Sequence, residues 1–312
     1  MKFRVLVLAA LAVIALGVGF EIWWQLGAGA PGREGADEVA APAAQPPLSA
    51  EAPKAVPAEA PAAPSPTPSP IGADGLPLPP APPRIAQGAE YERCLGMLKE
   101  DPAGAQAYAE AWEATGGKDG AVHCRAAALI ALGRLAQGAE MLERLARESA
   151  GPTAARAAIY AQATQAWLLA GDAQRAFASA TLALALSPDD LDMMIDRSIA
   201  AATMERYLDA IDDLNAVLDR DPKRADALVF RAAAWRHAGQ LGLAHDDVSR
   251  ALAVDPDNAE ALLERGIIRQ RRGDLAGARA DWQRVLDLAP DSASADFAQQ
   301  NLSLLEAGPA RR

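Results

Sequence analysis

The sequence lacks the short motifs that would assign an enzymatic reaction. It contains no His-Glu-x-x-His pair, no Gly-x-Ser-x-Gly turn and no glycine-rich phosphate loop. Its three histidines, His123, His237 and His245, lie far apart in the chain. His245 precedes Asp246 and Asp247, but consecutive helical residues point about 100° apart, so these three side chains do not converge. We therefore expect a non-catalytic protein without a bound metal or cofactor.

A surplus of positive charge is also missing. The net charge is -11, and residues 85–312 hold 25 basic against 34 acidic residues, a balance of −9. A phosphate backbone is bound by clustered Lys and Arg, which this balance does not provide. We expect no nucleic-acid partner and interpret the acidity as surface charge that favours solubility.

Aromatic residues are absent from residues 31–83, where sixteen of the 23 prolines fall. A segment of this composition buries too little apolar surface to offset the entropy lost on ordering. Residues 27–84 are therefore predicted to be a disordered Pro/Ala-rich linker, with folded structure beginning near Ile85. A flexible chain of that length has a typical reach of about 40 Å, and polyproline stiffness would extend it.

The first segment, residues 1–26, is predicted to be a membrane-targeting element. Val5–Phe20 is an apolar run after Lys2 and Arg4, and Trp23 and Trp24 follow it at the expected level of the lipid headgroups. The basic start predicts a single-pass inner-membrane anchor with its N-terminus inside, so that the rest of the chain lies in the periplasm. The alternative is a cleaved signal peptide, which delivers the chain to the same side.

Cysteine is scarce, with Cys94 and Cys124 as the only two. Outside the cytoplasm such a pair is commonly bridged, and alternate helices of a stacked array can touch, so a disulfide is one reading. The other reading is two small buried apolar side chains. Two thiols beside His123 lack a fourth ligand at suitable spacing, so no structural zinc site is expected.

An internal period dominates the rest of the chain. Four of the seven prolines outside residues 31–83 are 34 residues apart, and small or apolar residues repeat at the same step. The repeating columns are Pro188, Pro222, Pro256 and Pro290; Ala176, Ala210, Ala244 and Ala278; Leu184, Leu218, Leu252 and Leu286; Thr164, Ser198, Ala232 and Gly266; and Gly171, Glu205, Gly239 and Gly273.

Each 34-residue unit is predicted to form two helices. In one unit the first helix should stop at Gly239, and the second should end before Pro256, because proline cannot occupy a helix interior. Asn258 is positioned to cap the next helix. Small residues are needed where two antiparallel helices cross closely, which explains the columns of Ala, Ser, Thr and Gly.

These columns resemble the tetratricopeptide repeat family, whose 34-residue pattern places small residues, Gly, Ala and Pro at the same spacing. The resemblance implies an all-α, right-handed superhelical α-solenoid of helix hairpins, preceded by the disordered linker and the transmembrane helix. We assign residues 85–153 to divergent repeats, 154–290 to four repeats and 291–312 to a C-terminal capping helix and tail.

The resemblance also implies a concave groove lined by the first helices. Carried over by position, that groove would present Gln165, Ile195, Ile199, Val229, Arg236, Leu263, Ile267 and Arg271. An apolar centre of this kind is suited to a helix or an extended segment of another protein. Trp167, Trp235 and Trp282 occupy apolar repeat positions and are interpreted as packing residues.

The predicted function is a membrane-tethered scaffold that mediates protein–protein interactions in the cell envelope. The alternative is a chaperone-like biogenesis accessory that holds extended client polypeptides. A scaffold should have one stoichiometric partner, whereas a chaperone should bind many.

Overall fold

The computed structural model describes residues 84–307 of the chain. The predicted membrane segment and nearly all of the predicted linker lie outside the described residues. Within residues 84–307, no helix combines the length and apolar character needed to cross a membrane.

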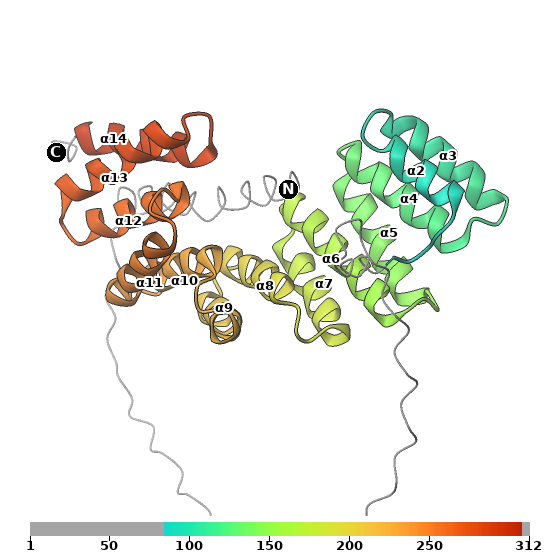
Figure 1. Ribbon diagram of the computed structural model, residues 1–312, viewed down its shortest axis with the longest axis horizontal. Coiled ribbons are helices and arrows are strands. Elements are labelled where there is room, and N and C mark those ends of the chain that lie inside the picture. The colour runs from blue at the N-terminus through green and yellow to red at the C-terminus, as the bar shows by residue number, and fades with distance from the viewer. Residues whose placement is uncertain (1–83, 308–312) are drawn as a thin grey trace, which may run out of the picture. The chain divides into compact units, whose positions relative to one another are not determined.

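The described residues form an all-α array of stacked helix hairpins. Successive helices pack against each other in chain order along a curved row (Figure 1). The thirteen helices between residues 84 and 307 are α2 (Ala89–Met97), α3 (Pro102–Ala114), α4 (Lys118–Ala131), α5 (Leu135–Glu148), α6 (Thr153–Leu169), α7 (Ala173–Leu186), α8 (Leu191–Thr203), α9 (Tyr207–Arg220), α10 (Ala225–His237), α11 (Leu241–Val254), α12 (Ala259–Arg271), α13 (Leu275–Leu288) and α14 (Ala293–Ala307).

The ends of the helices follow the local sequence signals. The Asn258 side chain accepts a hydrogen bond from the Ala261 amide at 2.8 Å, which confirms the predicted cap of α12. Gly239 follows α10 with φ +78°, and α11 ends at Val254, two residues before Pro256. Glu205 occupies the corresponding position after α8. Its φ of +60° is a left-handed conformation that is unfavourable for residues other than glycine.

The columns of small residues lie where helices cross. Ala176, Ala210, Ala244 and Ala278 are all buried, and so are Thr164, Ser198 and Ala232. Gly266 shows the closest approach, because a Cβ atom placed there would lie 2.3 Å from Nε1 of Trp282. Trp282 is fully buried, and its indole Nε1 donates to the Leu263 carbonyl at 3.3 Å. The packing interpretation of these columns and of Trp282 is therefore confirmed.

Three consecutive hairpins carry the same partly buried ion pair between their two helices. In each, an arginine of the first helix donates two hydrogen bonds to an aspartate sixteen residues later, with N–O distances of 2.6–3.0 Å. The pairs are Arg197–Asp213, Arg231–Asp247 and Arg265–Asp281. This two-point geometry fixes each first helix against its second helix.

Candidate functional site

The first helices of successive repeats touch each other. Contacts join α6 to α8, α8 to α10, and α10 to α12, in addition to the contacts between neighbours in the chain. First helices that contact the first helix of the next repeat lie on the inner side of a curved row. We call the surface that α6, α8, α10 and α12 share the first-helix face.

All eight residues predicted to line a groove lie on the first helices, but most of them are not open to solvent. Gln165 is half-buried and Arg271 is exposed. The other six have exposed fractions of 9% or less: Ile195, Ile199, Val229, Arg236, Leu263 and Ile267. The five apolar ones belong to the main hydrophobic core, because neighbouring first helices approach closely enough to enclose them. These residues are packed within the array in the free chain, and their assignment to a binding groove stays a prediction.

Arg236 and Glu264 form an ion pair inside the array. Arg236, on α10, is 1% exposed, and its Nε donates to Oε1 of Glu264 on α12 at 2.6 Å. Nη2 of the same arginine lies 3.4 Å from Oε2 of Glu264. Among the described residues, Nη1 of Arg236 has no hydrogen-bond acceptor. One donor group of this buried arginine is therefore left unsatisfied inside the array.

Asp196, on α8, is a second buried charged residue of this face. It is 6% exposed and accepts one long hydrogen bond, 3.5 Å, from the amide of Gln165 on α6. Burial raises the pKa of Asp196 to about 7; the Gln165 hydrogen bond lowers it, and the nearby Asp192 and Asp190 raise it. The carboxyl group is thus poised to change charge near neutral pH.

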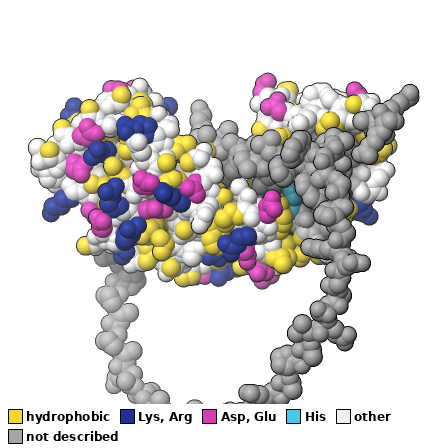
Figure 2. Space-filling view, turned by 180° about the vertical axis from the view of Figure 1, so that it is seen from behind, with side chains coloured by type: hydrophobic (Ala, Val, Ile, Leu, Met, Phe, Trp, Pro, Cys, Tyr) yellow, Lys and Arg dark blue, Asp and Glu magenta, His cyan; other side chains and the backbone are white. Residues whose placement is uncertain are grey.

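An arginine at the start of α10 joins two first helices at the rim of this face. Arg224 donates to Asp226 at 2.8 Å and 3.1 Å, and it also pairs with Asp192 of α8. The hydrogen bond with Asp226 is the largest of the effects that raise the pKa of Arg224. On the face drawn in Figure 2, acidic and basic side chains lie interspersed among apolar ones.

A small cavity lies between α8, α9 and α10. Its volume is about 10 Å³, which is room for roughly one water molecule. Apolar side chains such as Ile199, Leu214 and Phe230 line it, together with Tyr207 and His237. Tyr207 and His237 stack with their ring centroids 4.8 Å apart. This cavity is a packing feature, too small for an organic substrate.

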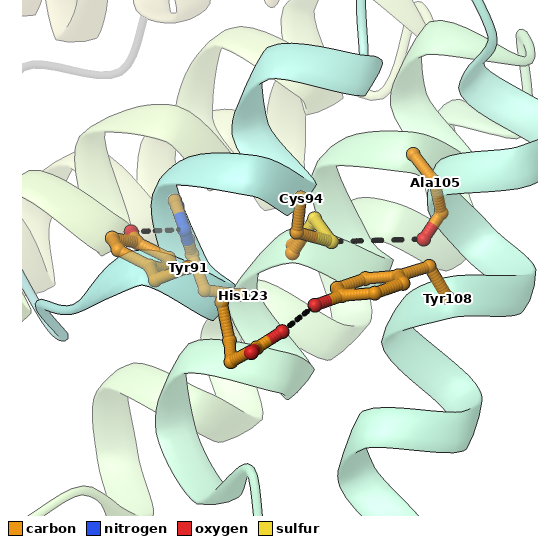
Figure 3. Close-up of a disulfide and its surroundings, with 7 residues drawn as sticks. Tyr91, Cys94, Ala105, Tyr108 and His123 are labelled. Atoms are coloured by element: carbon orange, nitrogen blue, oxygen red, sulfur yellow. Dashed lines mark hydrogen bonds between the residues drawn. A yellow bond between two sulfur atoms is a disulfide. The ribbon is translucent and has the colours of Figure 1, made fainter.

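A different polar cluster lies at the N-terminal end of the array. The structure joins Cys94 of α2 to Cys124 of α4 by a disulfide (Figure 3). Beside it the Tyr91 hydroxyl and Nδ1 of His123 lie 2.6 Å apart, and Nε2 of His123 lies 2.9 Å from the Gln162 side chain. Burial lowers the pKa of His123 and raises that of Tyr91 to about 12.

This cluster and the other candidate metal residues act in packing. Both ring nitrogens of His123 have partners, and the two sulfur atoms are bonded to each other. Asp247 pairs with Arg231, while Nδ1 of His245 lies 4.0 Å from Oδ1 of Asp246, so Asp247 and His245 have different partners. No group of residues suited to hold a metal ion occurs within residues 84–307.

Sequence reasoning did not single out Asp196 or the pairs between first and second helices. The pairs have a readable signal, because arginine recurs at 197, 231 and 265 and aspartate at 213, 247 and 281, each at the 34-residue step. Asp196 has a weaker one: an acidic residue set beside Ile195 on the apolar side of a helix.

A family model for the tetratricopeptide repeat matches residues 237–303. A solved tetratricopeptide repeat protein from Parabacteroides merdae is similar to this chain with a TM-score of 0.60 at 14% identity, covering 70% of this chain and 88% of that one. The family model supports the predicted repeat over residues 237–303, and the solved structure supports the predicted fold.

Two further solved structures are similar over much of the chain. A thermophilic tetratricopeptide repeat protein from Thermus thermophilus has a TM-score of 0.48 at 20% identity, covering 60% of this chain and 99% of that one. YrrB, described as a tetratricopeptide repeat protein with an unusual peptide-binding site, has a TM-score of 0.46 at 16% identity, covering 62% and 97%. No curated protein sequence matches.

Proposed function

We propose that this tetratricopeptide-repeat array is a non-catalytic scaffold that binds a segment of another protein on its first-helix face. The observation that carries the proposal is Asp196, a 6% exposed carboxyl group on α8 that accepts only one long hydrogen bond, from Gln165 of α6. Buried polar groups are normally satisfied, so this carboxyl group favours a ligand that brings a matching donor.

A polypeptide segment is the ligand that best fits these features. It supplies donors for Asp196 and apolar side chains that can pack against the partly exposed Ala202 of α8 and Phe230 of α10. The cavity of about 10 Å³ has no room for an organic small molecule. The acidic balance of the chain opposes a nucleic acid.

The tether belongs to the same proposal. The basic, apolar and aromatic pattern of residues 1–26 supports an inner-membrane anchor, and residues 27–84 support a linker that lets the array search for partners at raised effective concentration. The disulfide is compatible with an oxidising compartment such as the periplasm. Fractionation with protease accessibility from the periplasmic side tests this placement; a protected or cytoplasmic array would contradict it.

Photo-crosslinking in living cells tests the binding surface. Phe230 is half-buried on α10, and p-benzoylphenylalanine in its place keeps an aromatic ring. The matched control carries the same probe at Leu208 of the second helix α9, which is 67% exposed. We expect one discrete crosslinked protein from position 230. That protein should not be crosslinked from position 208.

The crosslinking pattern also separates the scaffold from the chaperone-like alternative. One partner in constant ratio to the chain is the scaffold result. Many partners that share only extended apolar segments are the result expected of a holding chaperone. Equal crosslinking from the first-helix and second-helix positions would contradict both.

A further inference from the structure

Asp196 is a buried carboxylate that no cation of the described residues neutralises. It is 6% exposed, and Gln165 is its only hydrogen-bond partner between residues 84 and 307. The charged groups that act on it, Asp190 and Asp192, carry the same sign as its own carboxylate. Arg224 pairs with Asp192 and Asp226 instead. Asp196 therefore lacks the opposite charge that a buried carboxylate ordinarily has.

Another repeat of the same chain shows what completes such a site. Asp196 and Glu264 occupy one repeat position, two steps of 34 residues apart. Glu264 accepts hydrogen bonds from Arg236, which precedes it by 28 residues. The residue 28 positions before Asp196 is Leu168. The repeat of α8 thus keeps the acid, whereas the preceding repeat of α6 has leucine in place of the arginine.

We propose that Asp196 and Gln165 form a subsite for an arginine side chain that a partner polypeptide inserts, in the place that Arg236 takes beside Glu264. This inference rests on the proposed function of the first-helix face. It specifies the arginine side chain as the group that this face recognises. Arginine fits better than lysine, because its planar fork can donate to both Asp196 oxygens and to the Gln165 carbonyl oxygen together.

The inserted side chain would enter between α6 and α8. Leu168 and Gln165 of α6 are half-buried, and Asp192, one turn before Asp196, keeps 68% of its side chain exposed. An arginine stem can lie along Leu168 while its head reaches Asp196. Asp190 and Asp192 favour the approach of a cation.

The subsite gives binding a defined pH dependence. An inserted arginine binds the ionised carboxylate, and burial holds the pKa of Asp196 at about 7 in the free chain. Lowering the pH from 8 to 6 protonates most of the carboxyl groups and should weaken binding by up to about tenfold. A partner bound elsewhere on the array would not show this dependence through Asp196.

A first experiment needs no partner. The Leu168→Arg variant of the full chain places an arginine at the same 28-residue offset as Arg236, and Leu168→Met serves as the uncharged control. NMR titration of the Asp196 carboxyl carbon should show its midpoint falling from about 7 toward the ordinary range in Leu168→Arg only. A folded Leu168→Arg variant with an unchanged midpoint would overturn the subsite.

A second experiment uses crosslinking from position 230. Asp196→Asn and Leu168→Arg should each reduce the partner's apparent affinity by about tenfold or more, the first by removing the acid and the second by filling the subsite. Asp212→Asn, an exposed aspartate of α9, is the matched control. Unchanged affinity in both subsite variants would overturn the arginine subsite while the binding function stands. No crosslink from position 230 in the unmodified chain would overturn the binding function itself.

Discussion

The ion pair between Arg236 and Glu264 provides a quantitative test of how the first helices are held together. Their side chains are 1% and 9% exposed, and two hydrogen bonds of 2.6 Å and 3.4 Å join them. Removing one partner leaves the other charge buried, which typically costs about 3–5 kcal/mol of stability. Glu264→Leu and Arg236→Met are each expected to lose that amount.

The double variant should behave differently. Replacing both charges by apolar side chains removes the desolvation cost along with the attraction, so Arg236→Met with Glu264→Leu should come within about 1 kcal/mol of the unmodified chain or exceed it. Urea unfolding followed by circular dichroism measures all four proteins of the cycle. The exposed Arg279–Glu306 pair is the control, where Glu306→Gln should cost at most about 1 kcal/mol.

The refuting outcome is additivity. If the double variant loses as much as the two single variants together, the residues are not coupled, and the buried pair does not join α10 to α12. The comparison of the Asp196 subsite with Glu264 would then lose its structural reference.

Three further perturbations test separate parts of the structure. Glu205→Gly should stabilise the chain by about 0.5–1 kcal/mol in urea unfolding, because φ of +60° strains a residue with a side chain; a loss of stability would refute this. Gly266→Ala should destabilise by about 1–3 kcal/mol and alter the fluorescence of Trp282, since the added Cβ would meet its Nε1 at 2.3 Å; a neutral result would contradict the tight crossing. Asp196→Asn should stabilise the free chain at pH 8 by on the order of 2–4 kcal/mol and have little effect near pH 4. The folded carboxyl with pKa about 7 opposes ionisation that the unfolded chain permits, so the penalty grows as pH rises from about 4 to 7. If the difference in unfolding free energy between Asp196→Asn and the unmodified chain does not vary with pH, the Asp196 carboxylate is not buried as described.

The hairpin architecture could be predicted from the sequence because its signals are local. Proline ends a helix wherever it falls, and glycine permits the left-handed turn that follows a first helix. Gly239 and Pro256 therefore located the ends of α10 and α11 to within two residues. The alanine and small-residue columns were readable for a related reason, since only small side chains fit at a close helix crossing.

The proposed binding surface was harder to predict because it depends on contacts between repeats. Ile199 and Val229 are apolar residues on first helices, and the pattern alone does not distinguish a groove lining from a buried contact with the next first helix. Arg236 and Glu264 are likewise visible as charges, but their contact across 28 residues requires the packing of α10 on α12. Asp196 becomes a candidate only once that contact is known.

Hydrogen exchange on the complex of the full chain with its crosslinked partner tests whether recognition takes place on the first-helix face. The partner should increase amide protection along the first helices α6, α8 and α10, with the largest change around Asp196. The second helices α7, α9 and α11 should change little. Protection confined to the second helices, or spread equally over both sets, would contradict recognition on the first-helix face.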